Sequence, residues 1–362
     1  MPKNPAETRS TEKPTEIGAS DGFSRGKLDR RISVAPMMDW TDRHCRYFLR
    51  GFSPDVLLYT EMITAAAILR GNRERLLAYD AAEHPVALQL GGSEPEDLAT
   101  AARIGAQFGY DEINLNCGCP SDRVHSGAFG ACLMLQPALV AECVAAMRSA
   151  VSLPVTVKLR IGVVAGQGGL AARQAVAQCT EADVEALLGF VSAVSTAGAA
   201  AVIVHARKAV LGGLSPKENR EVPPLRYDVV RIVKERFPKL SVILNGGLRQ
   251  VDPIREALSW CDGVMLGREA YHHPWLLVEL NAALGARLGQ LPDRALLLER
   301  MAAYAERELA RGERLPSITR HMLGLYTGEP GAREYRRRLS DGARDPAAGA
   351  HLLRQAAPEA AK

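Results

Sequence analysis

The segment NLNCGCPSDRVHSGAFGACLM, from Asn114 to Met134, holds three of the chain's seven cysteines. Structural zinc sites use about four ligands, commonly with cysteines in C-x-x-C pairs. Here a single residue separates Cys117 from Cys119, and Cys132 comes much later, so we expect no metal site. A disulfide between Cys117 and Cys119 would close a strained small ring. The irregular cysteine spacing instead predicts a reduced, cytoplasmic protein.

Cys119 differs from the other cysteines because it lies between Gly118 and Pro120, at the start of a Gly- and Ser-rich segment. A loop of this kind can fold over a substrate. Its thiol can then donate a proton to a ring carbon whose neighbour accepts a hydride. The alternative is a thiol that is simply a small buried apolar group. We expect that role for Cys132, Cys143, Cys179 and Cys261.

Eight short, β-rich apolar runs alternate with Ala- and Leu-rich segments of helical spacing. They cover residues 32–37, 57–62, 86–92, 112–117, 155–162, 201–207, 242–247 and 263–268. Such runs, joined by helices, predict parallel strands that are buried on both faces. Eight of them predict an α/β fold, a closed (β/α)8 TIM barrel. An open doubly wound sheet is the alternative, but no G-x-G-x-x-G motif follows the first run.

Both ends of the first long helical segment can be predicted from its residues. Ser93 followed by Glu96 is the pattern of a capping box, and Pro95 suits the first turn of a helix. Gly109 is a natural C-terminal stop. These residues predict a helix over Glu94–Phe108.

The loops that follow the strands carry the chemistry of a TIM barrel. The last two predicted strands end in Asn245-Gly246-Gly247 and in Gly267-Arg268. Glycines let backbone N–H groups approach an anion closely, so these two ends predict a phosphate site. The alternative is that the glycines only make tight turns.

Two further strand ends fit a flat, redox-active ring. The amide of Gln89 can pair with an imide edge, and Lys158 can hold the negative charge that develops on a reduced ring. Together with a phosphate site, these are the requirements of flavin mononucleotide, FMN. Each side chain could instead be a solvated polar residue of the rim.

The composition constrains the number of domains and the possible partners only loosely. With 362 residues, of which 47% are hydrophobic, the chain can fill one large barrel or two ordinary domains. The formal charge of +4 is too small to indicate a polyanionic partner by itself. No segment approaches the roughly 18 uncharged apolar residues that span a bilayer, so we expect no membrane association.

We divide the chain into four parts. Residues 1–30 are rich in charge, Pro, Gly and Ser and predict a disordered tail. Residues 31–284 form the predicted barrel, residues 285–345 a small helical domain, and residues 346–362 a flexible C-terminal tail.

The helical part concentrates the positive charge. Between Arg311 and Arg338 there are seven arginines and three glutamates, a balance of +4 that equals the surplus of the whole chain. Arg333 and Arg336 are three residues apart and predict one helical face suited to phosphate groups. A solvated face is the alternative. His321 and Tyr326 could pack in a core or stack on RNA bases.

The residues as a whole resemble the tRNA-dihydrouridine synthases, most closely the A-type bacterial branch. The resemblance covers nearly all of residues 32–340. It is carried by the segments VAPMMDWTDRHCR, LYTEMI, ALQLGG, NCGCPSDRVHSGAFGACLM, VKLRIG, VHARKAVLGGLSPKENREVPPLRYD, LNGG, GVMLGREAYHHPW and TRHMLGLYTGEPGAREYRRRLS.

This resemblance implies an FMN enzyme that uses NADPH to reduce the C5–C6 bond of uridines 20 and 20a in the tRNA D-loop. Hydride would pass from flavin N5 to C6, and Cys119 would protonate C5. The implied FMN contacts are Pro36, Met37, Met38, Gln89, Lys158, His205, Asn245, Gly246, Gly247, Gly267 and Arg268. The implied tRNA contacts are Asn116, Lys217 and Arg220, together with Arg333 and Arg336 in the helical domain.

Two features depart from the family pattern. Cys117 occupies a position that is usually aliphatic, and residues 163–189 form a longer, more Ala-rich segment than usual. Two other functions stay open. One is an FMN barrel that acts on a free pyrimidine, and the other is a tRNA-binding factor without catalysis. We expect a monomer.

Overall fold

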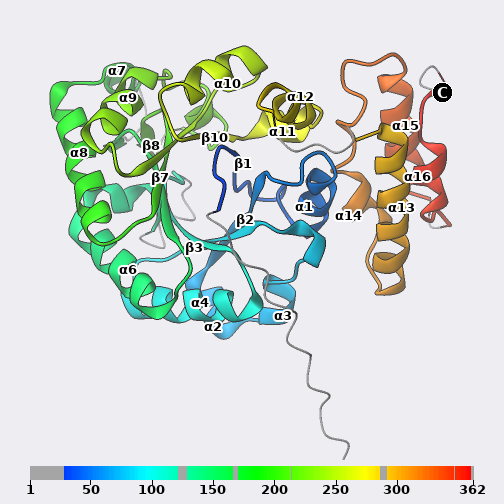
Figure 1. Ribbon diagram of the computed structural model, residues 1–362, viewed down its shortest axis with the longest axis horizontal. Helices are drawn as coiled ribbons and strands as arrows, with labels where there is room; N and C mark the ends of the chain where they lie inside the picture. Colours follow the sequence, from blue (N-terminus) through cyan, green and yellow to red (C-terminus); the bar gives the residue numbers. More distant parts are fainter. Residues whose placement is uncertain are drawn as a thin grey trace, which may run out of the picture.

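The computed structural model describes residues 28–120, 129–165, 170–212, 214–285, 292–345 and 347–359. Its main sheet is a closed, all-parallel barrel of eight strands in the order β1-β10-β9-β7-β5-β4-β3-β2. The order follows the chain around the barrel once, with helices on the outside (Figure 1). The prediction of a (β/α)8 TIM barrel is confirmed.

Each predicted run overlaps one barrel strand, although β2 continues past residue 62 and β9 begins one residue early. The strands are β1 Ile32–Val34, β2 Leu57–Thr64, β3 Val86–Gly91, β4 Glu112–Cys117, β5 Val155–Arg160, β7 Ala201–His205, β9 Ser241–Asn245 and β10 Gly263–Leu266. Several strands end before the predicted limit because the chain turns into its loop. After β1, the backbone N–H of Met37 already donates to the Thr41 hydroxyl, at 2.9 Å.

The outer layer consists of the helices that connect the strands. They include α1 Arg43–Arg50, α2 Ala65–Arg70, α3 Arg73–Leu76, α4 Pro95–Phe108, α6 Pro137–Ala150, α7 Leu170–Ala177, α8 Glu181–Thr196, α9 Tyr227–Arg236, α10 Val251–Leu258, α11 Arg268–His272 and α12 Leu276–Ala283. The main core lies between this layer and the strands, where residues such as Leu88 and Val157 are fully buried. That burial holds the strand ends, and hence their loops, in fixed positions.

Helix α4 corrects one sequence prediction. The N-cap residue is Glu94 rather than Ser93, and its side chain makes no capping hydrogen bond. The predicted capping box between Ser93 and Glu96 is therefore wrong. Pro95 at the first helical position has no N–H to satisfy, so the helix begins without a side-chain cap. The predicted stop is confirmed, because Gly109 adopts φ 95° and donates to the carbonyls of Ala106 and Gly105.

The barrel interior has an apolar and a polar layer. Side chains alternate along a strand, so every second residue points inward. The apolar inner cluster consists of Ala35, Leu57, Tyr59, Ala87, Ile203, Ile243 and Met265. Leu28 packs against this cluster, and Arg30 binds the buried Glu112 at 2.7 Å. The predicted tail of residues 1–30 is thus wrong for residues 28–30, and residues 1–27 lie outside the described part.

The segment after β5 adds a small sheet. β6 Val163–Ala165 pairs in parallel with β8 Ala209–Leu211, which follows β7. The two-stranded sheet contacts the 3₁₀ helix Gly130–Leu135 beyond the cysteine loop. The unusually Ala-rich segment therefore contributes to the structure around the barrel mouth.

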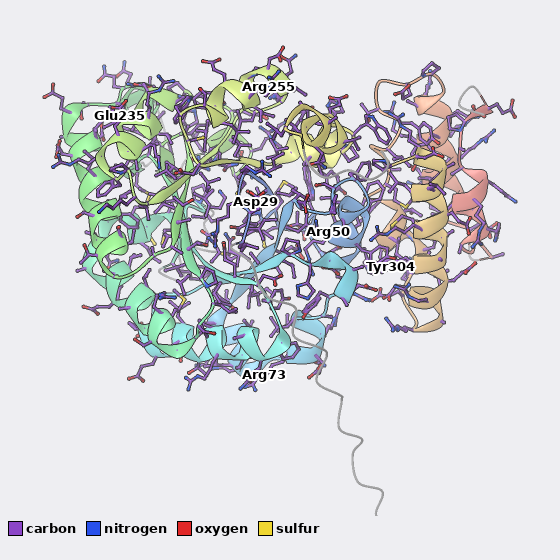
Figure 2. All side chains as sticks on the ribbon, in the orientation of Figure 1. Asp29, Arg50, Arg73, Glu235, Arg255 and Tyr304 are labelled. Atoms are coloured by element: carbon purple, nitrogen blue, oxygen red, sulfur yellow. The ribbon has the colours of Figure 1, made fainter. Side chains whose placement is uncertain are left out.

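The C-terminal helices stand beside the barrel, next to α1 (Figure 1). They are α13 Arg294–Ala310, α14 Leu315–Thr319, α15 Ala332–Gly342 and α16 His351–Gln355. Tyr304 of α13, labelled in Figure 2, stacks on Tyr47 with ring centroids 4.0 Å apart, and its hydroxyl lies 2.7 Å from Nδ1 of His44. These contacts fix the helical part on the barrel.

The end of the chain corrects a third prediction. We expected a flexible tail over residues 346–362, but residues 347–359 include α16, which packs on α13. Leu353 is fully buried and Ala356 is 1% exposed. Helix α16 lies against the side of α13 that faces away from the barrel (Figure 1). The last three residues lie outside the described part.

The two undecided aromatic residues both serve in packing. His321 is 1% exposed, and its Nε2 lies 3.0 Å from a carboxylate oxygen of Asp42. Tyr326 is 3% exposed and packs against Tyr335. Neither ring is available for stacking on RNA bases. In the described ranges, no helix is both long and apolar enough to cross a membrane.

Candidate active site at the barrel mouth

Basic side chains converge where β5 and β7 end. Lys158 and Arg160 point the same way from β5 because they are two residues apart. β7 pairs with β5 in a register that sets His205 opposite Arg160. The nearby Arg160 contributes to the lowered pKa of Lys158, and the charges of Lys158, Arg160 and Arg207 all contribute to the lowered pKa of His205. The mouth of the barrel is therefore strongly positive.

Lys158 is held by an amide of the neighbouring strand end. Its Nζ donates to Oδ1 of Asn245 at 3.1 Å, and Nδ2 of Asn245 donates to the Met265 carbonyl at 2.7 Å. The second bond fixes which end of the amide faces the lysine. Burial, together with the nearby Arg160, lowers the pKa of Lys158 to about 7. An anion beside this amine would favour its charged form.

Arg160 ties three loops together. Its Nε donates to the Gly118 carbonyl at 3.2 Å, and its Nη1 donates to the carbonyls of Asn219 and Lys208 at 2.9 and 3.3 Å. Burial lowers its pKa to about 9. Because its partners are neutral carbonyls, the guanidinium keeps an uncompensated charge beside the loop of Cys119.

His205 is uncharged in this setting. Burial lowers its pKa well below the usual value, and the charges of Arg160 and Lys158 lower it further. A neutral imidazole can donate one hydrogen bond and accept another. His205 is thus a neutral polar group among cations.

Cys119 begins the loop after β4, and Asn116 fixes the backbone on which it sits. Oδ1 of Asn116 accepts the N–H groups of Gly118 and Cys119, at 3.1 and 3.0 Å. The Cys119 carbonyl accepts the N–H of Ala131 at 2.9 Å. Cys119 is partly exposed, and a charge on its sulfur would raise the pKa values of Lys158 and Arg160. The thiol therefore lies next to the basic group, whereas residues 121–128 are outside the described part.

Cys117 is separate from this site. Its side chain is fully buried in the main core, and burial raises the pKa of its thiol well above the usual value. Strand alternation directs it away from the mouth, since Asn116 points inward. Cys117 forms no disulfide in the described structure. Nor do the described residues contain a group of three or more side chains that could hold a metal ion.

Gln89 lies deeper in the barrel than the sequence indicated. It is 1% exposed, its Oε1 accepts from Asn116 at 2.8 Å, and its Nε2 donates to Asn114 at 2.7 Å. The amide is thus oriented by its neighbours and is not a solvated rim residue. One N–H and one lone pair of this amide are not used by these two bonds.

The glycines at the last two strand ends differ in why glycine is present. Gly246 and Gly247 adopt φ 114° and 74°, and a Cβ on either would lie within 3 Å of His205 or Leu225. The turn itself therefore requires them. Around Gly267, a Cβ would meet no atom within 4 Å. The space beside its backbone is open and can receive a ligand.

The other predicted cofactor residues lie around the same mouth. Met37 is partly buried and packs against the inner apolar cluster, whereas Met38 is 55% exposed. Pro36, between Ala35 and Met37, is also partly buried. Arg268, the first residue of α11 after β10, pairs with Glu221 at 2.6 Å. Glu221 is exposed. Among the described residues, no carboxylate forms an ion pair with Lys158 or Arg160.

The predicted RNA-binding residues occupy two places. Lys217 and Arg220 lie on the loop after β8, close enough to the mouth that burial and the nearby Arg268 lower the pKa of Arg220. Arg333 and Arg336 lie on α15 in the helical part, and both are exposed. Asn116, the remaining predicted RNA contact, is 8% exposed and fully engaged in the barrel.

Sequence reasoning did not assign several residues that shape the site. Arg160 was given no role in the site. Asn219, fully buried, supports the loop of Arg220: its Oδ1 accepts the Val210 N–H at 2.8 Å. For Arg160 the available signal was its two-residue spacing from Lys158, which sets both on one face. Nothing in the sequence distinguished Asn219 from a solvated loop residue.

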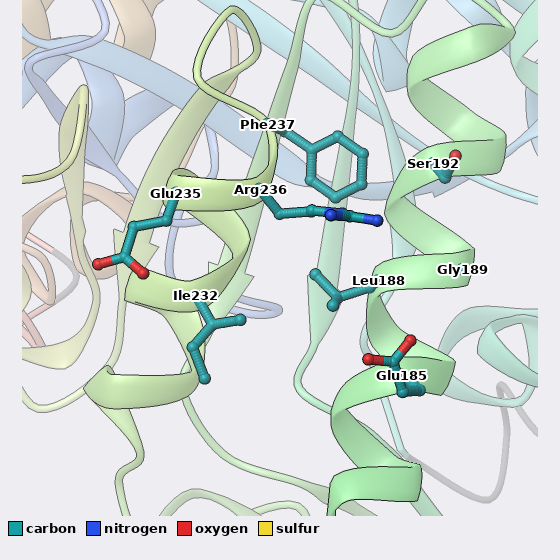
Figure 3. A pocket seen from close by; sticks show the side chains of 8 residues that line it. All are labelled: Glu185, Leu188, Gly189, Ser192, Ile232, Glu235, Arg236 and Phe237. Atoms are coloured by element: carbon teal, nitrogen blue, oxygen red, sulfur yellow. The ribbon is translucent and has the colours of Figure 1, made fainter.

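A shallow depression on the outer layer is unrelated to this site. It lies between α8 and α9 (Figure 3). Its lining includes Leu188, Ile232 and Phe237, with charged side chains such as Glu185 and Glu235 at the edge. It lies on the helices, whereas the basic group lies at the strand ends.

The fold and the site together define a TIM-barrel enzyme whose chemistry takes place at the C-terminal ends of its strands. The chain belongs to the dihydrouridine synthase family, whose model matches residues 33–362. This flavin-dependent family consists of oxidoreductases that act on uridine in tRNA, so the predicted family and enzyme class are confirmed.

Several relatives carry the name tRNA-dihydrouridine(20/20a) synthase. The protein from Xanthomonas campestris pv. campestris is 54% identical over 328 residues, which cover 90% of this chain and 92% of the relative. The Synechocystis protein is 52% identical over 325 residues, covering 90% and 93%. The Vibrio vulnificus protein is 50% identical over 327 residues, covering 90% and 95%.

Proposed function

We propose that the chain uses FMN and NADPH to reduce the C5–C6 bond of uridines 20 and 20a in tRNA. The names of its relatives support the substrate and the positions. The observation that carries the proposal is the combination, in one barrel mouth, of a braced thiol loop with Lys158 and Arg160, neither of which forms an ion pair with a carboxylate of the described residues.

The residues at the mouth fit FMN. The partly buried Lys158 and the buried Arg160 need an anion nearby, and the open space beside Gly267 leaves room for one. Gly246, Gly247, Gly267 and Arg268 would hold the phosphate, with backbone N–H groups as donors. Lys158 and His205 would face the ring, and Asn245 would orient Lys158. The remaining ring contacts would be Pro36, Met37, Met38 and Gln89.

The reaction consumes one uridine, one NADPH and one proton. Bound FMN would supply the hydride that adds to C6 of the uracil, and NADPH would restore the reduced flavin. Cys119 would donate the proton from Sγ to C5, so that both new C–H bonds are accounted for. The resulting thiolate would be stabilised by Lys158 and Arg160, whose positive charges lie close to it. A proton from solvent would restore the thiol.

A uridine in a folded tRNA is stacked, so it has to leave the stack before it can enter a barrel. We assign the holding of the surrounding backbone to Lys217 and Arg220 at the mouth and to Arg333 and Arg336 on α15. Asn116 would act at the edge of the uracil pocket mainly through the loop that it braces.

Position-resolved mapping of dihydrouridine in tRNA tests the proposal. In a strain that lacks the gene, dihydrouridine at positions 20 and 20a should be absent, and the wild-type gene should restore it. A gene encoding Cys119→Ala should not restore it. An unchanged dihydrouridine content in the deletion strain would reject the proposal.

The two alternative functions give different results. An enzyme for a free pyrimidine would oxidise NADPH with that pyrimidine and would leave tRNA unmodified. A binding factor without catalysis would shift tRNA on a gel and would purify without flavin absorbance. Flavin-loaded protein that turns over only with tRNA supports the proposal over both.

A further inference from the structure

A single file of hydrogen bonds runs through the barrel interior, from the cysteine loop to the opposite end. The Cys119 N–H donates to Asn116, Asn116 donates to Gln89 at 2.8 Å, and Gln89 donates to Asn114 at 2.7 Å. Asn114 donates to the Thr156 hydroxyl at 2.8 Å, and this hydroxyl donates to Oε1 of Glu112 at 2.6 Å. All the donors point toward the carboxylate.

The file is shielded from water. Glu112, Asn114 and Thr156 are fully buried, and Gln89 is 1% exposed. In such surroundings a polar group that loses its partner costs about 1–3 kcal/mol, and bonds in a chain polarise one another. Each link is therefore strongly constrained by the next.

The carboxylate decides the direction of the whole file. Oε2 of Glu112 accepts from Arg30 at 2.7 Å and Oε1 accepts from Thr156 and Tyr59, so both carboxylate oxygens act as acceptors. Thr156 must then donate to Oε1 and accept from Asn114. This choice turns the Asn114 oxygen toward Gln89.

The orientations of the next two amides, toward the mouth, follow in the same way. Gln89 must give its Nε2 to Asn114 and its Oε1 to Asn116. Asn116 then turns its Oδ1 toward the N–H groups of Gly118 and Cys119. With the opposite direction, an amide NH₂ would face those N–H groups, and the cysteine loop would lose its brace.

We propose that the ion pair of Glu112 with Arg30 is a positioning anchor for the reaction. Acting through Thr156 and Asn114, the anchor sets the orientation of the Gln89 amide and of Asn116. It thereby fixes the edge that Gln89 presents to the flavin and the backbone that carries Cys119. This inference rests on the proposed function, because it concerns the alignment of the same thiol and cofactor.

Thr156 offers the sharpest test because it is the one hydroxyl in the file. Thr156→Val keeps the shape of the side chain and removes both hydrogen bonds, whereas Thr156→Ser keeps the hydroxyl. For Thr156→Val we expect a roughly 10- to 100-fold lower kcat on tRNA, since about 1–3 kcal/mol of orienting interaction is lost. We also expect weaker FMN binding, a shifted flavin absorption band and little change in the KM for tRNA. Thr156→Ser should restore kcat and the spectrum.

Tyr59→Phe is the matched control. Its hydroxyl donates to the same Oε1 at 2.5 Å, is equally buried and also contacts the Thr156 hydroxyl, but it forms no link of the file between Glu112 and the mouth. Tyr59→Phe should therefore lower the melting temperature while leaving kcat and the flavin spectrum as in the wild type. If Thr156→Val and Tyr59→Phe lower stability equally and both keep wild-type kcat and spectrum, the anchor is refuted.

A second variant covers the case in which Thr156→Val does not fold. Arg30→Gln removes the counterion of Glu112 at the far end of the barrel. We expect it to lower kcat on tRNA, by less than Thr156→Val does. Wild-type kcat and spectrum in folded Arg30→Gln would then overturn the anchor. Wild-type protein that lacks flavin, or that is inactive on tRNA, refutes the proposed function instead, so the two failures are distinguishable.

Discussion

The barrel mouth and helix α15 both carry clusters of cations, yet in opposite environments. At the mouth, burial lowers the pKa values of Lys158 and Arg160 to about 7 and 9. On α15, Arg333 and Arg336 are exposed and have no ion pair with another described residue. The buried cations destabilise the protein unless an anion joins them, whereas the exposed ones cost little.

The two clusters of cations therefore suit two different functions. Buried charge without a carboxylate partner is retained where a ligand or a transition state needs it, and it acts at short range. Exposed arginines attract a polyanion at long range, and salt weakens their effect. We therefore assign chemistry to Lys158 and Arg160 at the mouth and the long-range attraction of tRNA to α15.

The largest effect should come from the thiol at the mouth. Cys119→Ala should lower turnover on tRNA by about 10²- to 10⁴-fold, the usual contribution of a general acid. Flavin content and the reduction of the flavin by NADPH should stay normal. Stopped-flow and steady-state kinetics can measure the three quantities separately.

Cys117→Ala is the control for this variant, because Cys117 is two residues away and fully buried in the core. It should cost stability without a comparable loss of turnover. If Cys117→Ala loses turnover and Cys119→Ala does not, the assignment of the acid is wrong.

A smaller effect should come from the exposed cluster. Replacing Arg333 and Arg336 together with Gln should weaken tRNA binding about tenfold at moderate salt. Each lost phosphate contact lowers the slope of log K against log salt by about 0.7–0.9. NADPH oxidation without tRNA should be unchanged, and a salt titration of tRNA binding measures the effect.

The matched control replaces Arg103 of α4 and Arg148 of α6, two exposed arginines on the barrel helices far from α15 (Figure 1). This pair should leave the salt slope unchanged. Equal losses for both double variants would show that net charge, rather than the face of α15, governs binding.

The smallest effect is a change in the pH dependence of stability. In the flavin-free protein, the pKa of Lys158 is about 7, against 10.5 for an ordinary lysine. Between these values the unfolded chain holds a proton that the folded chain releases, so this group makes the free energy of unfolding rise with pH. Below about pH 7 both states are charged, and the contribution is constant.

Lys158→Met should therefore stabilise the flavin-free protein most near about pH 6.5 and progressively less toward about pH 9. Thermal unfolding of both proteins across this range measures the difference. Lys239→Met, at an exposed position, is the control and should show no such trend. A constant difference for Lys158→Met would mean that the pKa of this amine is not lowered in the folded protein.

The sequence predicted the barrel and much of its mouth because those features are local. Apolar runs located the eight strands, and the flanking residues placed Cys119 and Lys158 at strand ends. Helix α4 shows the limit of local signals, because Pro95 made the expected cap at Ser93 unnecessary.

Other features depend on residues that only the fold brings together. The interior file joins Gln89, Asn114 and Thr156 from three neighbouring strands, so its direction follows from register. Helix α16 is short and depends on the apolar face of α13 for its burial. Neither leaves a recognisable pattern in the sequence itself.

The most direct test of the central claim compares FMN with riboflavin. If the mouth provides a phosphate site and cations for an anionic ligand, flavin-free protein should bind FMN roughly 10- to 100-fold more tightly than riboflavin, as one or two charge-assisted hydrogen bonds would give. Fluorescence titration measures both dissociation constants, and Cys119→Ala should give the same ratio. Equal affinities for the two flavins, or no binding of either, would contradict the account.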